Sequence, residues 1–269
     1  MTILPAELAG AVLEFLGVAQ GPPDLALLDR LLGAYGRRVP WESASRIARR
    51  WGTAGLNERP RWAGEFWRQA IAQGTGGTCF ESNLAFLALL KQLGFESYLT
   101  INNMGETRGC HTAIVVLLHG RRWLADAGYP LYAAVPLDTH RATGRETPFF
   151  HYSARPVATD EYLIEGVPHP TPYLFNLIDQ PVDPAEYCRA TADDYGEGGL
   201  FLNRIIIRKI VGEQIWRFDS DAKPYHLQTF HAGQRSDHPI EGDVVAALSA
   251  HYGIAPGVLA AAFDALPAR

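Results

Sequence analysis

The sequence predicts an α+β fold, because helical and strand-like patterns occupy different parts of the chain. Apolar residues recur at helical spacing through most of the first 95 residues. Short runs rich in β-branched, leucine and aromatic residues follow between residues 97 and 178, with glycine and proline between them. The last third has further strand-like runs and ends in two short helical segments. These observations favour helices first, an antiparallel sheet or small barrel second, and a mixed C-terminal part.

Four amphipathic helices are expected in the first part. Residues 6–18 carry leucine, valine and phenylalanine on a helical period, and Asp24 can cap a second helix. Residues 62–73 form the third and residues 80–93 the fourth, which a glycine ends. Three arginines at positions 46, 49 and 50 are expected on a solvated helix face.

Strands are expected in the middle and near the C-terminus, with His119-Gly120 as a hairpin turn. The polar stretch 181–203, with two prolines and three glycines, is the best linker candidate. This division gives a helical part over 1–95, a barrel over 96–180, the linker and a last part over 204–269. The expected strands are 97–103, 112–119, 121–126, 161–167, 173–178, 204–211, 214–218 and 224–230, and the final helices lie near 240–252 and 255–266.

Composition excludes several classes of protein. The 269 residues are 47% hydrophobic and 20% charged, as in folded globular proteins, and the net charge of −5 argues against a nucleic-acid-binding role. Three cysteines without a Cys-x-x-Cys pair disfavour a disulfide scaffold and a four-ligand zinc site, so no metal is expected. No apolar run approaches a membrane span and no basic region precedes the N-terminal apolar residues. We therefore expect no membrane partner and a reducing cytoplasm.

The strongest local motif is a glycine pair before Cys79, which opens the fourth helix. Glycines allow a sharp turn and a close backbone approach. Free N–H groups and the partial positive charge of a helix N-terminus favour a thiolate. The N–H of Phe80 is a candidate donor to an oxyanion on a bound acyl group.

A thiolate nucleophile needs a base held by a third group. His111 begins the strand before His119-Gly120, and Asp126 ends the strand after it. A hairpin centred there pairs 112 with 127 or 111 with 128, and a slip of one or two residues brings His111 and Asp126 within side-chain reach. Cys79, His111 and Asp126 are therefore candidates for a Cys-His-Asp triad.

These residues make the chain resemble the arylamine N-acetyltransferases. The family signature is Arg-Gly-Gly-x-Cys with Glu and Asn two and four positions later, and here residues 75–79 read Thr-Gly-Gly-Thr-Cys, followed by Glu81 and Asn83. The His-led strand of the family is similar to 111–116, and its Asp-x-Gly-Phe segment is similar to 126–129. Weaker matches continue to the C-terminal helices, so the resemblance covers essentially the whole chain.

The resemblance implies a helical bundle, a β-barrel and an α/β lid around a cysteine-protease-like core. It implies a ping-pong reaction in which acetyl-coenzyme A acetylates Cys79, His111 is the base and Asp126 orients it. An aromatic amine, hydrazine or hydroxylamine then takes the acetyl group. Tyr129 would flank the acceptor pocket, and Gly128 would leave room for the pantetheine arm of the donor. Coenzyme A would be a co-substrate, with no permanently bound cofactor.

Departures from the family pattern leave the substrate open. Thr75 stands where the family usually has Arg, for which we expect a changed salt-bridge network rather than lost catalysis. Pro130 follows Tyr129 in place of Gly, and Ser43 replaces Asn. The alternatives are an amide synthase that uses a larger acyl thioester, a transglutaminase-like Cys-His-Asp hydrolase, and a non-catalytic binding module.

Overall fold

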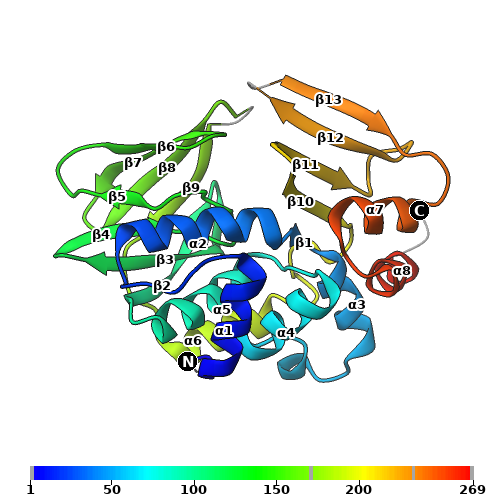
Figure 1. Cartoon of the computed structure of the whole chain (residues 1–269), viewed down its shortest axis with the longest axis horizontal. Coiled ribbons are helices and arrows are strands. Elements are labelled where there is room, and N and C mark those ends of the chain that lie inside the picture. Colours follow the sequence, from blue (N-terminus) through cyan, green and yellow to red (C-terminus); the bar gives the residue numbers. More distant parts are fainter. Residues whose placement is uncertain (1–2, 170–171, 232–233, 267–269) are drawn as a thin grey trace.

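The computed structural model describes residues 3–169, 172–231 and 234–266. Helices of the first hundred residues lie at the bottom of Figure 1, an antiparallel sheet curls at the left, and a second sheet with two helices lies at the right. The predicted α+β class is thus confirmed.

Helix α5 is the centre of the N-terminal part. It carries a buried residue at every position from Cys79 to Leu90, as expected of a helix covered on all sides. Helices α1 and α4 pack on it, and strands β2 and β3 cover another face. The helices of this part are α1 Ala6–Leu16, α2 Leu25–Arg38, α3 Ala44–Gly52, α4 Ala63–Gln73 and α5 Cys79–Gln92, with a 3₁₀ turn η1 at Leu56–Glu58.

The larger sheet is a nearly closed barrel. Within the described residues its strand order is β5-β4-β3-β2-β9-β8-β7-β6, and all of its pairs are antiparallel. The two end strands approach each other, and the Thr143 hydroxyl donates to the Pro136 carbonyl across the gap. Its strands are β2 Glu96–Met104, β3 Thr107–Leu118, β4 Arg121–Ala125, β5 Val135–Leu137, β6 Thr143–Glu146, β7 His151–Ala158, β8 Glu161–Val167 and β9 Tyr173–Ile178.

The β3–β4 hairpin has the predicted turn. His119 and Gly120 have φ values of 50° and 73°, which suit the two central residues of a tight hairpin turn. The pairing runs from Leu118 opposite Arg121 to Ile114 opposite Ala125. This register extrapolates to 112 opposite 127, so the slip considered for the hairpin does not occur.

The smaller sheet includes a strand from the N-terminal part. Its order is β1-β10-β11-β12-β13, and α3 packs against α8 beside it. Residues 41–52 therefore join the C-terminal part, across the division expected at residue 95. The elements are β1 Trp41–Glu42, β10 Ile206–Val211, β11 Gln214–Asp219, β12 His226–His231, β13 Gln234–Pro239, α7 Val244–Tyr252 and α8 Pro256–Ala265.

The expected linker is not a free connection. It contains α6, Pro184–Asp193, whose Tyr187 is fully buried and donates a 2.8 Å hydrogen bond to the Phe80 carbonyl. Tyr195, beyond the helix, is also fully buried. The linker prediction was wrong because these two aromatic rings anchor a mostly polar segment to the α5 core.

Five strands escaped prediction, among them β1, which has only two residues. Strands β5 and β6 are short, and β7 contains His, Arg and Pro among its small residues. Strand β13 is exposed at every position, so it lacks the alternation by which a half-buried strand is recognised. Among the described helices, none is long and apolar enough to cross a membrane.

Candidate active site

The segment before Cys79 passes very close to β1. A Cβ added to Gly76 would lie 1.6 Å from the Pro40 carbonyl oxygen, so only glycine fits there. The Gly76 N–H donates to the Glu42 carboxylate at 3.1 Å, and the Glu42 N–H donates to the Gly77 carbonyl at 3.3 Å. The backbone of this turn is thus held by direct hydrogen bonds to β1.

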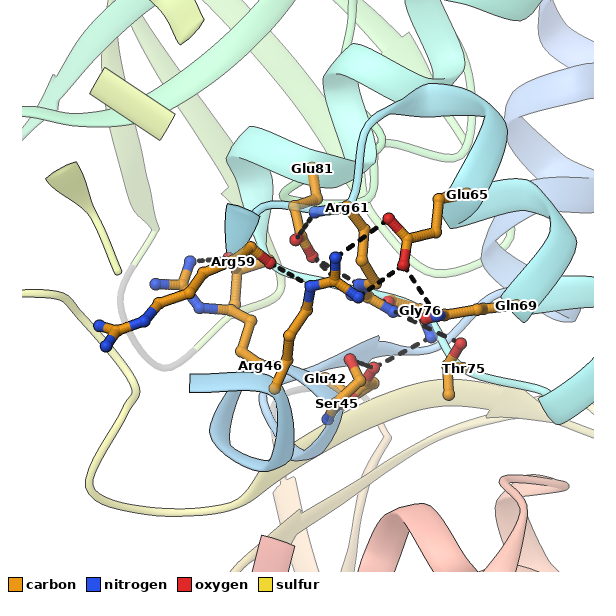
Figure 2. Close-up of polar contacts among 12 residues, drawn as sticks. Glu42, Ser45, Arg46, Arg59, Arg61, Glu65, Gln69, Thr75, Gly76 and Glu81 are labelled. Atoms are coloured by element: carbon orange, nitrogen blue, oxygen red, sulfur yellow. Dashed lines mark hydrogen bonds and ion pairs between the residues drawn. The ribbon is translucent and has the colours of Figure 1, made fainter. Parts of the chain in front are cut away.

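A buried ion pair holds the same turn from the other side (Figure 2). The Arg61 guanidinium lies 2.5 Å from a Glu81 carboxylate oxygen, and it donates to the Gly76 carbonyl at 2.6 Å. The Arg61 side chain is also 3.5 Å from the Thr75 hydroxyl. Burial raises the pKa of Glu81, but Arg61 outweighs it and the net shift is downward. Arg61 therefore supplies a guanidinium beside Thr75.

A second buried arginine secures the residue before the cysteine. Arg46 donates to the Thr78 hydroxyl at 2.7 Å and pairs with Asp194 at 2.5 Å, while its guanidinium stacks over the Tyr195 ring. The prediction of a solvated face was wrong for Arg46, which is 1% exposed. Its counter-ion lies 148 residues away in the chain, so local sequence did not reveal the pairing.

Cys79 is the first residue of α5 and is 8% exposed. Its backbone carbonyl accepts a 3.0 Å hydrogen bond from the Thr112 hydroxyl, which ties the start of α5 to β3. Its Sγ lies 3.6 Å from the Cys110 carbonyl oxygen. The thiol is thus at a helix N-terminus beside the His-led strand, as the sequence predicted.

His111 and Asp126 are in direct contact. His111 Nε2 lies 2.7 Å from Asp126 Oδ2, and both side chains are buried. This contact needs no register slip, because Asp126 follows the end of β4 and its side chain turns back toward β3. Burial lowers the pKa of His111, but the charge and hydrogen bond of Asp126, together with Cys79, raise it to about 10.

Asp126 is held by a set of donors that the sequence analysis did not assign. Its Oδ1 accepts from the backbone N–H groups of Gly128 at 2.7 Å and Tyr129 at 2.8 Å. Asn83 donates to the same oxygen at 2.9 Å and accepts from the N–H of Ala127. Asn83 lies one helical turn after Cys79, so this bridge couples the position of the carboxylate to that of the thiol.

The remaining predicted site residues lie in different environments. A Cβ on Gly128 would be 2.4 Å from Cys79 Cα, so this glycine allows close contact with the cysteine. The Tyr129 ring lies edge-on to His111, with 6.5 Å between ring centroids. The Phe80 ring packs on Tyr187 in the core, so any contribution of Phe80 to the site comes from its backbone N–H.

A cavity of about 600 Å³ opens over the cysteine. Cys79, His111, Gly128 and Tyr129 contribute to its wall, together with residues of the smaller sheet. That sheet and the turn before β10 also supply a group of arginines, which sequence reasoning did not single out: Arg204, Arg208, Arg217 and Arg235. The arrangement brings a thiol, an imidazole–carboxylate pair and positive charge to one apolar cavity.

Comparison with known proteins now identifies the family. A family model described as N-acetyltransferase matches residues 24–169, more than half of the chain, so the chain belongs to this family. The resemblance to arylamine N-acetyltransferases is thereby confirmed. A comparison with curated proteins finds no match.

Solved structures have the same fold. The arylamine N-acetyltransferase of Mycobacterium abscessus is 21% identical over 97% of this chain and 95% of its own, with a TM-score of 0.78. The Mycobacterium marinum enzyme in complex with CoA is 16% identical over 96% and 100%, with a TM-score of 0.78. The Bacillus cereus enzyme, which has a Cys-His-Glu catalytic triad, is 18% identical over 93% and 100%, with a TM-score of 0.74.

Replacing Arg61 by methionine should destabilise the protein strongly, because Glu81 would remain as a buried charge without its main partner. We expect the free energy of unfolding, measured by urea denaturation, to fall by about 3–5 kcal/mol. Arg141→Met is the matched control, since Arg141 is 81% exposed in its pair with Asp138 and should contribute less than about 1 kcal/mol. Equal losses for the two variants would contradict this account.

Replacing Gly128 by alanine should displace Cys79, because the new methyl group would lie 2.4 Å from Cys79 Cα and 2.6 Å from Cys79 Cβ. We expect a loss of about 1–3 kcal/mol in unfolding free energy and slower alkylation of Cys79 by iodoacetamide. Gly10→Ala is the control, since a Cβ on Gly10 meets nothing within 4 Å. Normal stability and alkylation in the Gly128 variant would refute the steric role.

The His111–Asp126 pair predicts a pH dependence of stability. Because the pKa of His111 is raised to about 10, its stabilising contribution is complete below the unfolded value of about 6.5. It disappears as pH rises through about 10. The difference in unfolding free energy between wild type and Asp126→Asn should therefore shrink from pH 6.5 to pH 10 in denaturation curves. A difference that stays constant over this range would contradict the ion pair.

Proposed function

We propose that the protein transfers an acetyl group from acetyl-coenzyme A to an aromatic amine, hydrazine or hydroxylamine through a thioester on Cys79. The observation that carries this proposal is the 2.7 Å His111–Asp126 contact beside a thiol at a helix N-terminus. Membership of the N-acetyltransferase family supports the reaction class. The CoA complex of the Mycobacterium marinum enzyme supports the donor.

In the first half-reaction, His111 already holds the proton of the Cys79 thiol, so the sulfur reacts as a thiolate. Nε2 of His111 is engaged with Asp126, which leaves Nδ1 to face the sulfur. The thiolate attacks the acetyl carbonyl, and the backbone N–H groups at the start of α5 stabilise the oxyanion. The coenzyme A thiolate leaves, takes the proton from His111, and the acetyl group stays on Cys79.

In the second half-reaction, the amine attacks the Cys79 thioester. His111 takes a proton from the attacking nitrogen, and Cys79 leaves as a thiolate. The product is an amide, and the enzyme returns to its starting state. We assign Tyr129 to the acceptor pocket, since its ring lines the cavity beside His111. The role of Asp126 parallels that of the glutamate in the Cys-His-Glu triad of the Bacillus cereus enzyme.

The donor has a cationic surface available on the smaller sheet. Arg204, Arg217 and Arg235 line the cavity and already pair with aspartates. We assign the coenzyme A phosphates to this group, because phosphate oxygens compete well for guanidinium donors. Gly128 lies directly beside Cys79, where the pantetheine arm must bring its thioester.

We assign the protein to a reducing compartment such as the cytoplasm. Cys79, Cys110 and Cys188 are all free thiols, and the chemistry needs Cys79 in its reduced form.

Intact mass spectrometry after incubation with acetyl-coenzyme A alone tests the proposed function. We expect a mass gain of one acetyl group in wild type and in Cys188→Ala, and none in Cys79→Ala. Cys188→Ala is the matched control, since Cys188 lies on α6 and does not line the cavity. An acetylated wild type should then lose its acetyl group to an arylamine or hydrazine.

Other results would favour the alternatives. No adduct, with Cys79 still rapidly alkylated, would overturn the acetyl donor and favour longer acyl-coenzyme A or carrier-protein thioesters, as an amide synthase uses. Burial raises the pKa of Cys110, so we expect slow labelling of Cys110. Cleavage of glutamine or peptide amides would favour a hydrolase. No adduct and slow alkylation of Cys79 would leave a binding module.

A further inference from the structure

A second cysteine shares the cavity with Cys79. Cys110 and Cys79 both line its wall, whereas Cys188 lies on α6 outside the cavity lining. The Cys79 Sγ lies 3.6 Å from the Cys110 carbonyl oxygen, so this sulfur already contacts the backbone of the second cysteine. Both residues are free thiols, and Cys110 is partly exposed. Two thiols therefore reach one small space, although they are 31 residues apart in the chain.

Cys110 lies at the base of an exposed hairpin tip, beyond the regular part of the ladder. Uninterrupted pairing of β2 with β3 ends at Asn102 opposite His111, and a register shift follows. Residues 105–109 at the tip are all exposed. The Cys110 Sγ donates to the Thr107 carbonyl at 3.3 Å, and an S–H group is a weak donor. The Cys110 side chain is therefore held weakly where it is, and another rotamer costs little.

The two thiols differ in reactivity. Cys79 is the first residue of α5, where the helix N-terminus favours a thiolate, and the thiolate is the form that peroxides oxidise. Burial is the main cause that raises the pKa of Cys110, and the nearby Cys79 sulfur adds to it. Cys110 thus stays protonated at neutral pH. An oxidant reacts with Cys79 first, and Cys110 remains reduced beside the product.

We propose that Cys110 is the resolving thiol for Cys79, so that a hydroperoxide converts the pair into a reversible disulfide. This inference rests on the proposed function only for the reactivity of the Cys79 thiolate, and it adds a modification of the same site. Cytosolic disulfides of this kind are transient, which agrees with a reducing compartment.

The chemistry takes two steps. The Cys79 thiolate attacks one oxygen of hydrogen peroxide and becomes a sulfenic acid, the O–O bond breaks, and the released hydroxide takes the proton that His111 holds. The Cys110 sulfur then attacks the Cys79 sulfur, the S–O bond breaks, and the hydroxyl group leaves with the thiol proton as water. Two thiols lose two electrons together, and the peroxide is reduced to two molecules of water.

The disulfide stops oxidation at a stage that can be reversed. A sulfenic acid without a neighbouring thiol is oxidised further to a sulfinic acid, which thiol reductants do not restore. A disulfide is reduced by thiol exchange, which returns both cysteines. Acyl transfer pauses while Cys79 is in the disulfide and resumes after its reduction.

Peptide mapping after peroxide treatment tests the proposal. The protein is oxidised with hydrogen peroxide, blocked with iodoacetamide and digested with trypsin without reductant. We expect peptides 69–91 and 109–121, which carry Cys79 and Cys110, to be joined with the loss of two hydrogens. Cys188→Ala is the matched control and should form the same joined pair. In Cys110→Ser, which nearly keeps the size of the side chain but removes the thiol, Cys79 should instead gain two oxygens as a sulfinic acid.

Recovery with dithiothreitol gives a second readout. After full oxidation of Cys79, we expect more than about half of its iodoacetamide labelling to return in wild type and less than about a tenth in Cys110→Ser. Equal recovery in the two proteins would overturn the resolving role. A disulfide between Cys79 and Cys188, or sulfinic acid as the main product in wild type, would also overturn it. Thermal unfolding checks that each variant folds.

Neither readout uses acetyl transfer, so the two proposals can fail separately. Rapid alkylation of Cys79 before oxidation, with no disulfide afterwards, would overturn the role of Cys110 and leave the proposed function standing. A Cys79–Cys110 disulfide in a protein that forms no acetyl adduct would support the resolving role and overturn the acetyl donor. Slow alkylation of Cys79 together with no disulfide would overturn both.

Discussion

The buried Arg61–Glu81 ion pair is the interaction on which the site depends. Charged groups are stable in a protein interior only when they are paired and hydrogen-bonded. Here one guanidinium satisfies a carboxylate on α5 and the carbonyl of Gly76 together. The pair thus fixes the glycine turn relative to the helix that begins with Cys79. A charged side chain is not needed at position 75, because the guanidinium of Arg61, from another segment, lies beside Thr75.

The site also depends on hydrogen bonds that connect helix α5 to the barrel. Asn83 connects α5 to the Asp126 carboxylate, and the Thr112 hydroxyl connects β3 to the carbonyl of Cys79. Gly128 lets the loop after β4 lie directly against the cysteine. The thiol, the imidazole and the carboxylate come from three elements, yet shared hydrogen bonds hold them in one arrangement. Little side-chain entropy then remains to be lost when a substrate binds.

The smaller sheet completes the cavity and gives it charge. Its first strand, β1, comes from the N-terminal part and also holds the glycine turn, so the sheet is connected directly to the segment before Cys79. Three of its cavity arginines are balanced by aspartates and suit an exchangeable polyanion. Arg208, on the same sheet, lies over the rings of Tyr129 and Phe150 in the cavity wall.

The sequence by itself determined the amphipathic helices, the hairpin at His119-Gly120 and the Cys-His-Asp candidates. These depend on local periodicity, turn chemistry and short motifs, which neighbouring residues carry. Only the tertiary structure decided that Arg46 is buried, that residues 181–203 hold a docked helix, and that Arg208 faces the cavity. Each of these depends on partners distant in the chain, and burial and charge pairing follow from that packing rather than from local pattern.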